Sequence, residues 1–240
     1  MKKEISIILP IHNEKDSLPI MIRLLNASIK FTKEIIIVYD TEKDNALDVA
    51  KELSEEFDNV KLIHNTKARG VKYAVDVGIQ NAKYDVVMIF AVDEIFPVIA
   101  IDKMLTHLIE NDLDFISGTR YSKGGVRLGG SFLGAIFSRI ANKLFNIFTD
   151  IPLTDCTTGI KMLKKNVWNE IHLESKPVGW AYAFELTIKV YIKNYKVDEF
   201  PLKSVDRLFG GSSTFRLGPW LIEYMKWFIW GIKNVKKNKK

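Results

Sequence analysis

The sequence predicts an α/β fold built on a mainly parallel sheet that is flanked by helices on both faces. Short apolar runs alternate with segments of helical spacing through the first half of the chain. The runs are apolar at nearly every position, which is typical of strands that are covered on both faces. Regular alternation of the two patterns favours parallel strands, because each parallel pair needs a long crossover, usually a helix.

The elements of the first half follow one another without a break. Ile5–Leu9 is rich in β-branched residues and is closed by Pro10, which cannot donate to a strand ladder. A helix is predicted over Asp16–Lys30, where apolar residues recur every three or four positions. The same two criteria predict the further strands Glu34–Tyr39, Val60–His64, Asp85–Phe90 and Phe115–Gly118, and the further helices Asn45–Phe57, Val71–Asn81 and Ala100–Asn111.

The second half of the chain predicts longer helices and fewer strands. Leu128–Phe148 carries aromatic and aliphatic residues at four-residue spacing, which indicates a helix. Strands are expected at Thr158–Leu163 and Lys196–Pro201, with a helix over Tyr182–Asn194 between them.

A final aromatic helix is predicted over Pro219–Val235, because proline suits the start of a helix and aromatic residues are concentrated after it. Its apolar stretch contains Glu223 and Lys226 and is shorter than the roughly 20 residues that a transmembrane helix needs. We therefore expect a domain over residues 1–216, followed by an aromatic helix and basic tail over residues 217–240.

The positive charge of the chain is concentrated near residue 240. The formal net charge is +6. The residues that supply most of it are Lys233, Lys236, Lys237, Lys239 and Lys240. The rest of the chain is close to neutral, which argues against a nucleic-acid-binding protein. The basic segment fits either a solvated end or the surface of an anionic membrane.

Two features favour a cytoplasmic location. The single cysteine, Cys156, excludes an internal disulfide and fits a reducing compartment. The first residues do not read as a signal peptide, because Glu4 follows two lysines closely and Pro10 ends the apolar run early.

Polar residues follow the first two predicted strands. Pro10, Asn13 and Glu14 belong to the loop after the first strand, and Asp40 ends the second. At the carboxyl edge of an open α/β sheet, such loops contact nucleotides. The alternatives are local, since Asn13 or Asp16 is also a candidate helix cap and Asp40 also begins a turn.

Two acids, Asp93 and Glu94, come directly after the apolar fourth strand. A divalent cation that bridges a diphosphate needs hard oxygen ligands, usually one or two carboxylates together with phosphate and water. The pair is therefore a candidate metal site. The alternative is a pair of solvated loop acids.

Candidate phosphate ligands occur in two later loops. Arg120 and Lys123 precede a glycine pair, and Arg207 lies in a loop rich in glycine and serine. The alternatives are an ordinary turn and a surface arginine. Cys156 has no histidine at a telling distance, so we expect a small buried residue and not a nucleophile.

Taken together, these motifs resemble the family 2 glycosyltransferases of the GT-A fold, and among them the dolichyl- or polyprenyl-phosphate sugar synthases. The resemblance covers roughly residues 4–216. It rests on the order and spacing of Ile8–Glu14, Lys67–Gly70, Asp93 with Pro97, Gly118–Tyr121 with Gly124 and Gly125, Asp155–Gly159, Gly179–Glu185, and Asp206–Arg207 with Gly210 and Ser212.

The resemblance implies transfer of a sugar from a UDP- or GDP-sugar to a lipid phosphate, by an enzyme held peripherally on the cytoplasmic membrane. The roles it implies are nucleotide binding for Pro10, Asn13, Glu14, Asp40 and Arg69, phosphate binding for Arg120, Arg207 and Ser212, metal binding for Asp93 and Glu94, and catalysis for Asp93, Glu185 and Arg207. Ala91 stands where the family has another acid, so the Mg²⁺ or Mn²⁺ ion is expected to be weakly bound or dispensable.

Two functions stay open on the sequence. One is an active glycosyltransferase, and the other is a non-catalytic relative that binds a nucleotide, a lipid phosphate or a protein partner. A homo-oligomer is compatible with either function. We favour the enzyme, because Arg120 and Arg207 are retained although the acid-x-acid pattern is incomplete.

Overall fold

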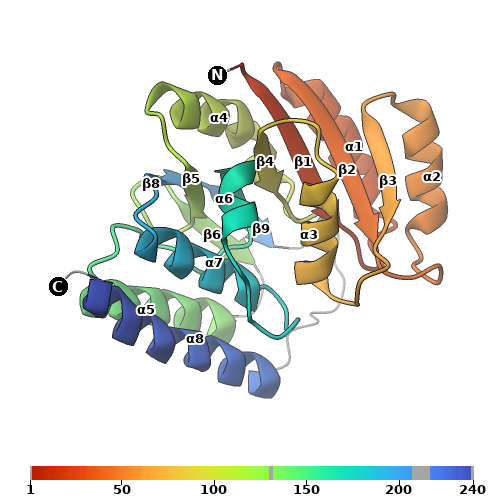
Figure 1. The fold of residues 1–240 in the computed structure, drawn as a ribbon. Helices are drawn as coiled ribbons and strands as arrows, with labels where there is room; N and C mark the ends of the chain where they lie inside the picture. Colours follow the sequence, from red (N-terminus) through yellow and green to blue (C-terminus); the bar gives the residue numbers. More distant parts are fainter. Residues whose placement is uncertain (1, 130–131, 207–216, 239–240) are drawn as a thin grey trace.

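The structure is a computed structural model that describes residues 2–129, 132–206 and 217–238. At its centre is a seven-stranded sheet with the strand order β3-β2-β1-β4-β7-β5-β8 (Figure 1). Its strands are β1 (Glu4–Pro10), β2 (Thr32–Tyr39), β3 (Val60–His64), β4 (Val86–Ile89), β5 (Phe115–Thr119), β7 (Lys161–Lys164) and β8 (Val197–Pro201). Only β7 runs antiparallel to its neighbours, so the described sheet is mainly parallel, as the sequence predicts.

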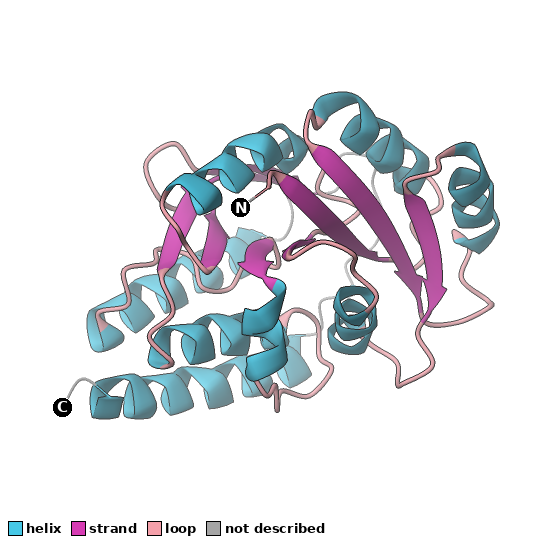
Figure 2. Cartoon of the chain, turned by 45° about the horizontal axis from the view of Figure 1, so that its top comes forward, coloured by secondary structure: helices cyan, strands magenta, loops and turns pink. Residues whose placement is uncertain are grey.

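Helices cover both faces of this sheet (Figures 1 and 2). One face packs against α1 (Ser17–Ser28), α2 (Leu47–Glu56), the short 3-10 helix η1 (Phe96–Ala100) and α4 (Ile101–Glu110). The other face packs against α3 (Val71–Gln80), α6 (Lys165–Glu170) and α7 (Ala181–Ile192). Because successive side chains of a strand point to opposite faces, Ile7 belongs to the first apolar cluster and Ile8 to the second.

Two long helices, α5 (Phe132–Thr149) and α8 (Leu217–Asn238), lie side by side beyond α7 (Figure 1). Phe145, Phe184 and Trp227 of α5, α7 and α8 belong to a third apolar cluster, in which the rings of Phe145 and Phe184 meet edge to face at 5.0 Å. No helix in the described ranges is both long and apolar enough to cross a membrane.

Two of the predicted elements differ in the structure. Leu128 belongs to β6 (Val126–Gly129), which pairs with β9 (Lys203–Asp206) in a small second sheet, and the helix begins only at Phe132. β7 begins at Lys161 and not at Thr158, because the Asp155 carboxylate accepts the backbone N–H groups of residues 157 and 158 and holds them in a turn.

Candidate functional site

The parallel pairing of β1, β2 and β4 brings the segments that follow these strands to one edge of the sheet. β1 lies between the other two strands, with Pro10 opposite Val38 and Ile8 opposite Ile89. Asn13, Asp40 and Asp93 come after the ends of the three strands and therefore lie at this carboxyl edge. Ligands of open α/β sheets usually bind at such an edge.

The loop after β1 is fixed by Asp44, an aspartate that the sequence analysis did not single out. Its buried carboxylate accepts the backbone N–H of Asn13 at 3.1 and 3.2 Å and that of Ala46 at 2.9 Å. Asn13 has a φ of 61°, a conformation that asparagine tolerates better than most residues. Glu14 accepts the backbone N–H of His12 at 3.0 Å. The predicted nucleotide residues after β1 thus belong to one loop that is tied to the loop after β2.

Asp40 shapes the loop that follows β3. One carboxylate oxygen accepts the side-chain amide of Asn65 at 2.7 Å, and the other accepts the backbone N–H of Gly70 at 2.7 Å. Gly70 has a φ of +119°, so a side chain there would be strained. Arg69 is exposed and precedes this glycine. Asp40 and Arg69 therefore border the same small region at the carboxyl edge.

The acids after β4, Asp93 and Glu94, are both partly exposed. Glu94 accepts a hydrogen bond from the buried hydroxyl of Ser204 at 2.8 Å. In the part of the chain that the structure describes, no group of three or more acids, histidines or cysteines forms a metal site. Two carboxylates fit a Mg²⁺ or Mn²⁺ site that a bound diphosphate completes with its own oxygens.

Arg120, expected to face a phosphate, lies against Asp155. Its Nε is 2.7 Å from Asp155 Oδ2 and its Nη2 is 3.1 Å from Oδ1. Burial disfavours the charged guanidinium, but the attraction of Asp155 outweighs it and raises the pKa of Arg120 above its ordinary value. The geometry thus gives Arg120 a structural partner, and its phosphate contact stays a prediction.

Glu185, expected beside the reacting sugar or acceptor, is fully buried. Its two oxygens accept the backbone N–H groups of Glu174 and Ser175, each at 2.7 Å, and the Lys189 ammonium lies 2.7 Å from Oε1. A buried carboxylate with these partners anchors a loop, because each backbone donor would otherwise lack a partner. The geometry gives this residue a structural role and does not support the catalytic one.

Arg207 and Ser212 lie outside the described residues, so their phosphate roles stay predictions. A buried lysine, Lys161, was missed by the sequence analysis because it lies within the apolar strand β7. Its ammonium donates to Ser117 Oγ at 2.7 Å, and burial lowers its pKa to about 8. Cys156 is buried, as expected, and burial raises the pKa of its thiol to about 12.

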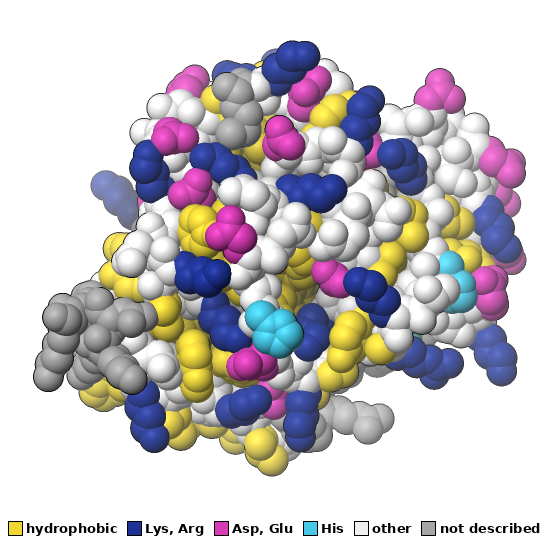
Figure 3. Space-filling model, in the orientation of Figure 1, with side chains coloured by type: hydrophobic (Ala, Val, Ile, Leu, Met, Phe, Trp, Pro, Cys, Tyr) yellow, Lys and Arg dark blue, Asp and Glu magenta, His cyan; other side chains and the backbone are white. Residues whose placement is uncertain are grey.

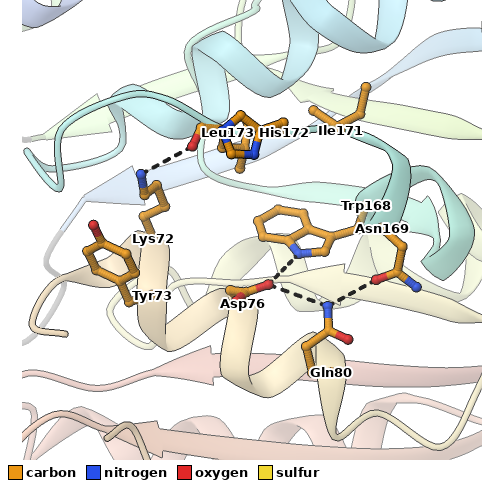
Figure 4. Close-up of a pocket in the computed structure, with 9 residues that line it drawn as sticks. All are labelled: Lys72, Tyr73, Asp76, Gln80, Trp168, Asn169, Ile171, His172 and Leu173. Carbon is orange, nitrogen blue, oxygen red and sulfur yellow. Dashed lines mark hydrogen bonds between the residues drawn. The ribbon is translucent and has the colours of Figure 1, made fainter. Parts of the chain in front are cut away.

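A shallow pocket of about 250 Å³ lies between α3 and the segment that contains α6 (Figure 4). Asp76, Trp168 and Gln80 line it and bond to one another, with the indole N–H 2.9 Å from the Asp76 carboxylate. None of the predicted site residues lines this pocket, so it is separate from the predicted nucleotide site.

Comparison with known proteins agrees with this arrangement. The model of the family described as "Glycosyl transferase family 2" matches residues 6–171. The chain belongs to glycosyl transferase family 2. It is 31% identical over 228 residues to a dolichol-phosphate mannosyltransferase of Pyrococcus furiosus, and the match covers 93% of this chain and 62% of the relative. Glycosyltransferase AglD of Haloferax volcanii is 21% identical over 83% of this chain and 32% of its own length. The chain therefore spans less than two thirds of either relative.

Solved structures support the fold of this family 2 member. The glucosyl-3-phosphoglycerate synthase of Mycobacterium tuberculosis, in complex with Mn²⁺, UDP and glucosyl-3-phosphoglycerate, superposes with a TM-score of 0.72 at 14% identity. The superposition covers 96% of this chain and 80% of the synthase. The predicted GT-A fold is confirmed.

Proposed function

We propose that this family 2 member transfers a sugar from a nucleotide-diphospho-sugar to a polyprenyl phosphate or a related membrane acceptor. The observation that carries the proposal is the meeting of Asn13, Asp40 and Asp93 at one carboxyl edge of a GT-A sheet. The acceptor class is suggested by the similarity to the dolichol-phosphate mannosyltransferase.

In this proposal the loops after β1, β2 and β3 bind the nucleotide, through Pro10, Asn13, Glu14, Asp40 and Arg69. Asp93, with Glu94 beside it, holds a divalent cation that neutralises the charge of the diphosphate as it leaves. Arg207 and Ser212 complete the phosphate contacts. A phosphate acceptor is already mostly ionised at pH 7, so no strong general base is needed to activate it. The burial of Glu185 is compatible with that chemistry.

We also propose a peripheral location on the cytoplasmic face of a membrane. Exposed apolar side chains occur along both long helices, namely Ile136, Phe137, Ile140, Leu144, Ile147 and Phe148 on α5 and Leu221, Ile222, Met225 and Ile229 on α8. We call this set the α5–α8 apolar surface. Figure 3 shows hydrophobic side chains along the lower edge of the molecule, where Figure 1 draws α8. Lys226 and Lys233 are exposed on α8 and further lysines follow, which suits anionic lipid headgroups.

A second candidate is favoured by one observation. Ala91 replaces an acid of the family pattern, and the described residues bring no three metal ligands together. A non-catalytic relative that binds the nucleotide without turnover would be compatible with both findings.

An activity assay distinguishes the two candidates. The purified chain would be incubated with radiolabelled UDP- and GDP-sugars and a polyprenyl phosphate in detergent, with Mn²⁺, with Mg²⁺ or with a chelator. We expect label to enter the organic phase, and we expect Asp93→Ala to reduce that transfer at least tenfold. Nucleotide binding without transfer under every condition would favour the non-catalytic relative.

A further inference from the structure

The loop over residues 173–180, between α6 and α7, is held by side chains from three helices. Glu185 of α7 accepts the backbone N–H groups of Glu174 and Ser175. Lys72 of α3 donates to the backbone carbonyls of Ser175 at 2.6 Å and Leu173 at 3.4 Å, and Figure 4 shows the second of these contacts. The loop is therefore fixed between the central domain and α7.

The third anchor comes from the C-terminal helix. Glu223 of α8 is only 3% exposed, and its Oε1 accepts the backbone N–H of Lys176 at 3.0 Å. The same oxygen accepts the indole N–H of Trp227 at 3.0 Å. Trp220 packs so closely on Gly179 that a Cβ there would lie 2.1 Å from the indole ring. The loop therefore rests directly on α8.

The same loop touches the region that Asp40 shapes. A Cβ added to Gly70 would lie 2.8 Å from Cβ of Pro177, so the two backbones are in close contact. Gly70 donates its backbone N–H to Asp40 at 2.7 Å. A continuous set of contacts thus runs from Glu223 through Lys176 and Pro177 to Gly70 and Asp40.

We infer that Glu223 is a positioning residue for the nucleotide site. Its carboxylate fixes Lys176, which holds Pro177 against Gly70 and so keeps the loop after β3 in the conformation that Asp40 and Arg69 use. A buried carboxylate suits this task, because losing it leaves a backbone donor and an indole donor unpaired. The inference rests on the proposed function, since it assumes that this edge binds a nucleotide.

The inference is tested by calorimetric titration of the full chain with UDP and with GDP, each in the presence of Mn²⁺. Glu223→Ala should weaken binding of the preferred nucleotide at least fivefold. Glu223→Gln keeps an oxygen acceptor for Lys176 and should bind within twofold of the wild type. Ile222→Ala, on the exposed side of α8, serves as the matched control and should also stay within twofold.

A second pair of variants reaches the same contact without touching the buried carboxylate. Pro177 is exposed, and Pro177→Gly removes the Cβ that meets Gly70, whereas Pro177→Ala keeps it. Pro177→Gly should weaken nucleotide binding as Glu223→Ala does, Pro177→Ala should weaken it less, and combining Pro177→Gly with Glu223→Ala should add little to either.

Two negative results have different meanings. If the wild-type chain binds a nucleotide and both Glu223→Ala and Pro177→Gly bind it equally well, the inference is overturned and the proposed function stands. If the wild-type chain binds neither UDP nor GDP, the proposed function is overturned and the inference with it.

Discussion

Arg120 and Asp155 form a two-point ion pair between the end of β5 and the turn before β7, with N–O distances of 2.7 and 3.1 Å. Asp155 is fully buried and also accepts the backbone N–H groups of Thr157 and Thr158. Burial disfavours its charged form, but Arg120 outweighs burial and lowers the pKa of Asp155 below its usual value. The pair therefore keeps a turn beneath the carboxyl edge in one conformation.

Replacing this aspartate should destabilise the fold strongly. Asp155→Asn leaves the Arg120 charge buried without its partner, and breaking a buried pair costs about 3–5 kcal/mol. Urea unfolding followed by circular dichroism would measure the change in the free energy of unfolding. Asp58→Asn, on an exposed loop, is the control and should change that energy by less than about 0.5 kcal/mol. An equally small effect of Asp155→Asn would contradict a structural role for the pair.

Lys161 should make stability depend on pH in the alkaline range. Burial lowers its folded-state pKa to about 8 from 10.5, so the folded chain releases this proton before the unfolded chain does. Its contribution to the free energy of unfolding therefore rises with pH between these two values.

The comparison that isolates this effect is Lys161→Met, made in a Cys156→Ala background that removes the neighbouring thiol. At pH 7 the charged lysine should be the less stable alternative, and its disadvantage should shrink by about 2 kcal/mol by pH 9.5. Unfolding free energies at five or six pH values would show the trend. A constant difference across this range would mean that the lysine titrates as it does in water.

Restoring the missing acid should tighten metal binding. Ala91→Asp adds a carboxylate two positions before Asp93, and one charge-assisted contact is worth about 1.5–3 kcal/mol, or roughly tenfold or more in affinity. Calorimetry with Mn²⁺ at saturating UDP or GDP would measure the gain. Ala91→Asn supplies a similar shape without charge and should gain less. Mn²⁺ affinity that is the same in Ala91→Asp and in Asp93→Ala would exclude metal binding at this loop.

The α5–α8 apolar surface should bind anionic vesicles. Ile222 is 72% exposed and Ile229 is 49% exposed, and replacing both with glutamate should weaken co-sedimentation at least tenfold. The reason is that burying one isoleucine side chain contributes about 1.5–3 kcal/mol. Salt should also weaken binding, since each lysine near an anionic surface adds about 1 kcal/mol.

Ile99→Glu is the matched control for the vesicle experiment, because Ile99 is 64% exposed but lies on η1, away from both long helices. It should leave co-sedimentation unchanged. If the wild-type chain stays in the supernatant at low salt and sediments as a stable dimer in the ultracentrifuge, the apolar surface is a contact between two copies.

The sequence by itself determined the strand–helix alternation and the edge at which the site lies. Periodicity depends on neighbours along the chain, and the fully apolar runs β1, β2 and β4 could only be strands covered on both faces. Once those strands are parallel, Asn13, Asp40 and Asp93 must follow them at a common edge.

Only the tertiary structure decided which charges face a ligand and which face the protein. Arg120 and Asp155 are 35 residues apart, and Lys176 and Glu223 are 47 residues apart. Local pattern cannot report such pairs, because the partner of a charge is set by where distant segments cross. For the same reason Glu185 looks like an exposed catalytic acid in the sequence, and the folded chain makes it the buried anchor of the 173–180 loop.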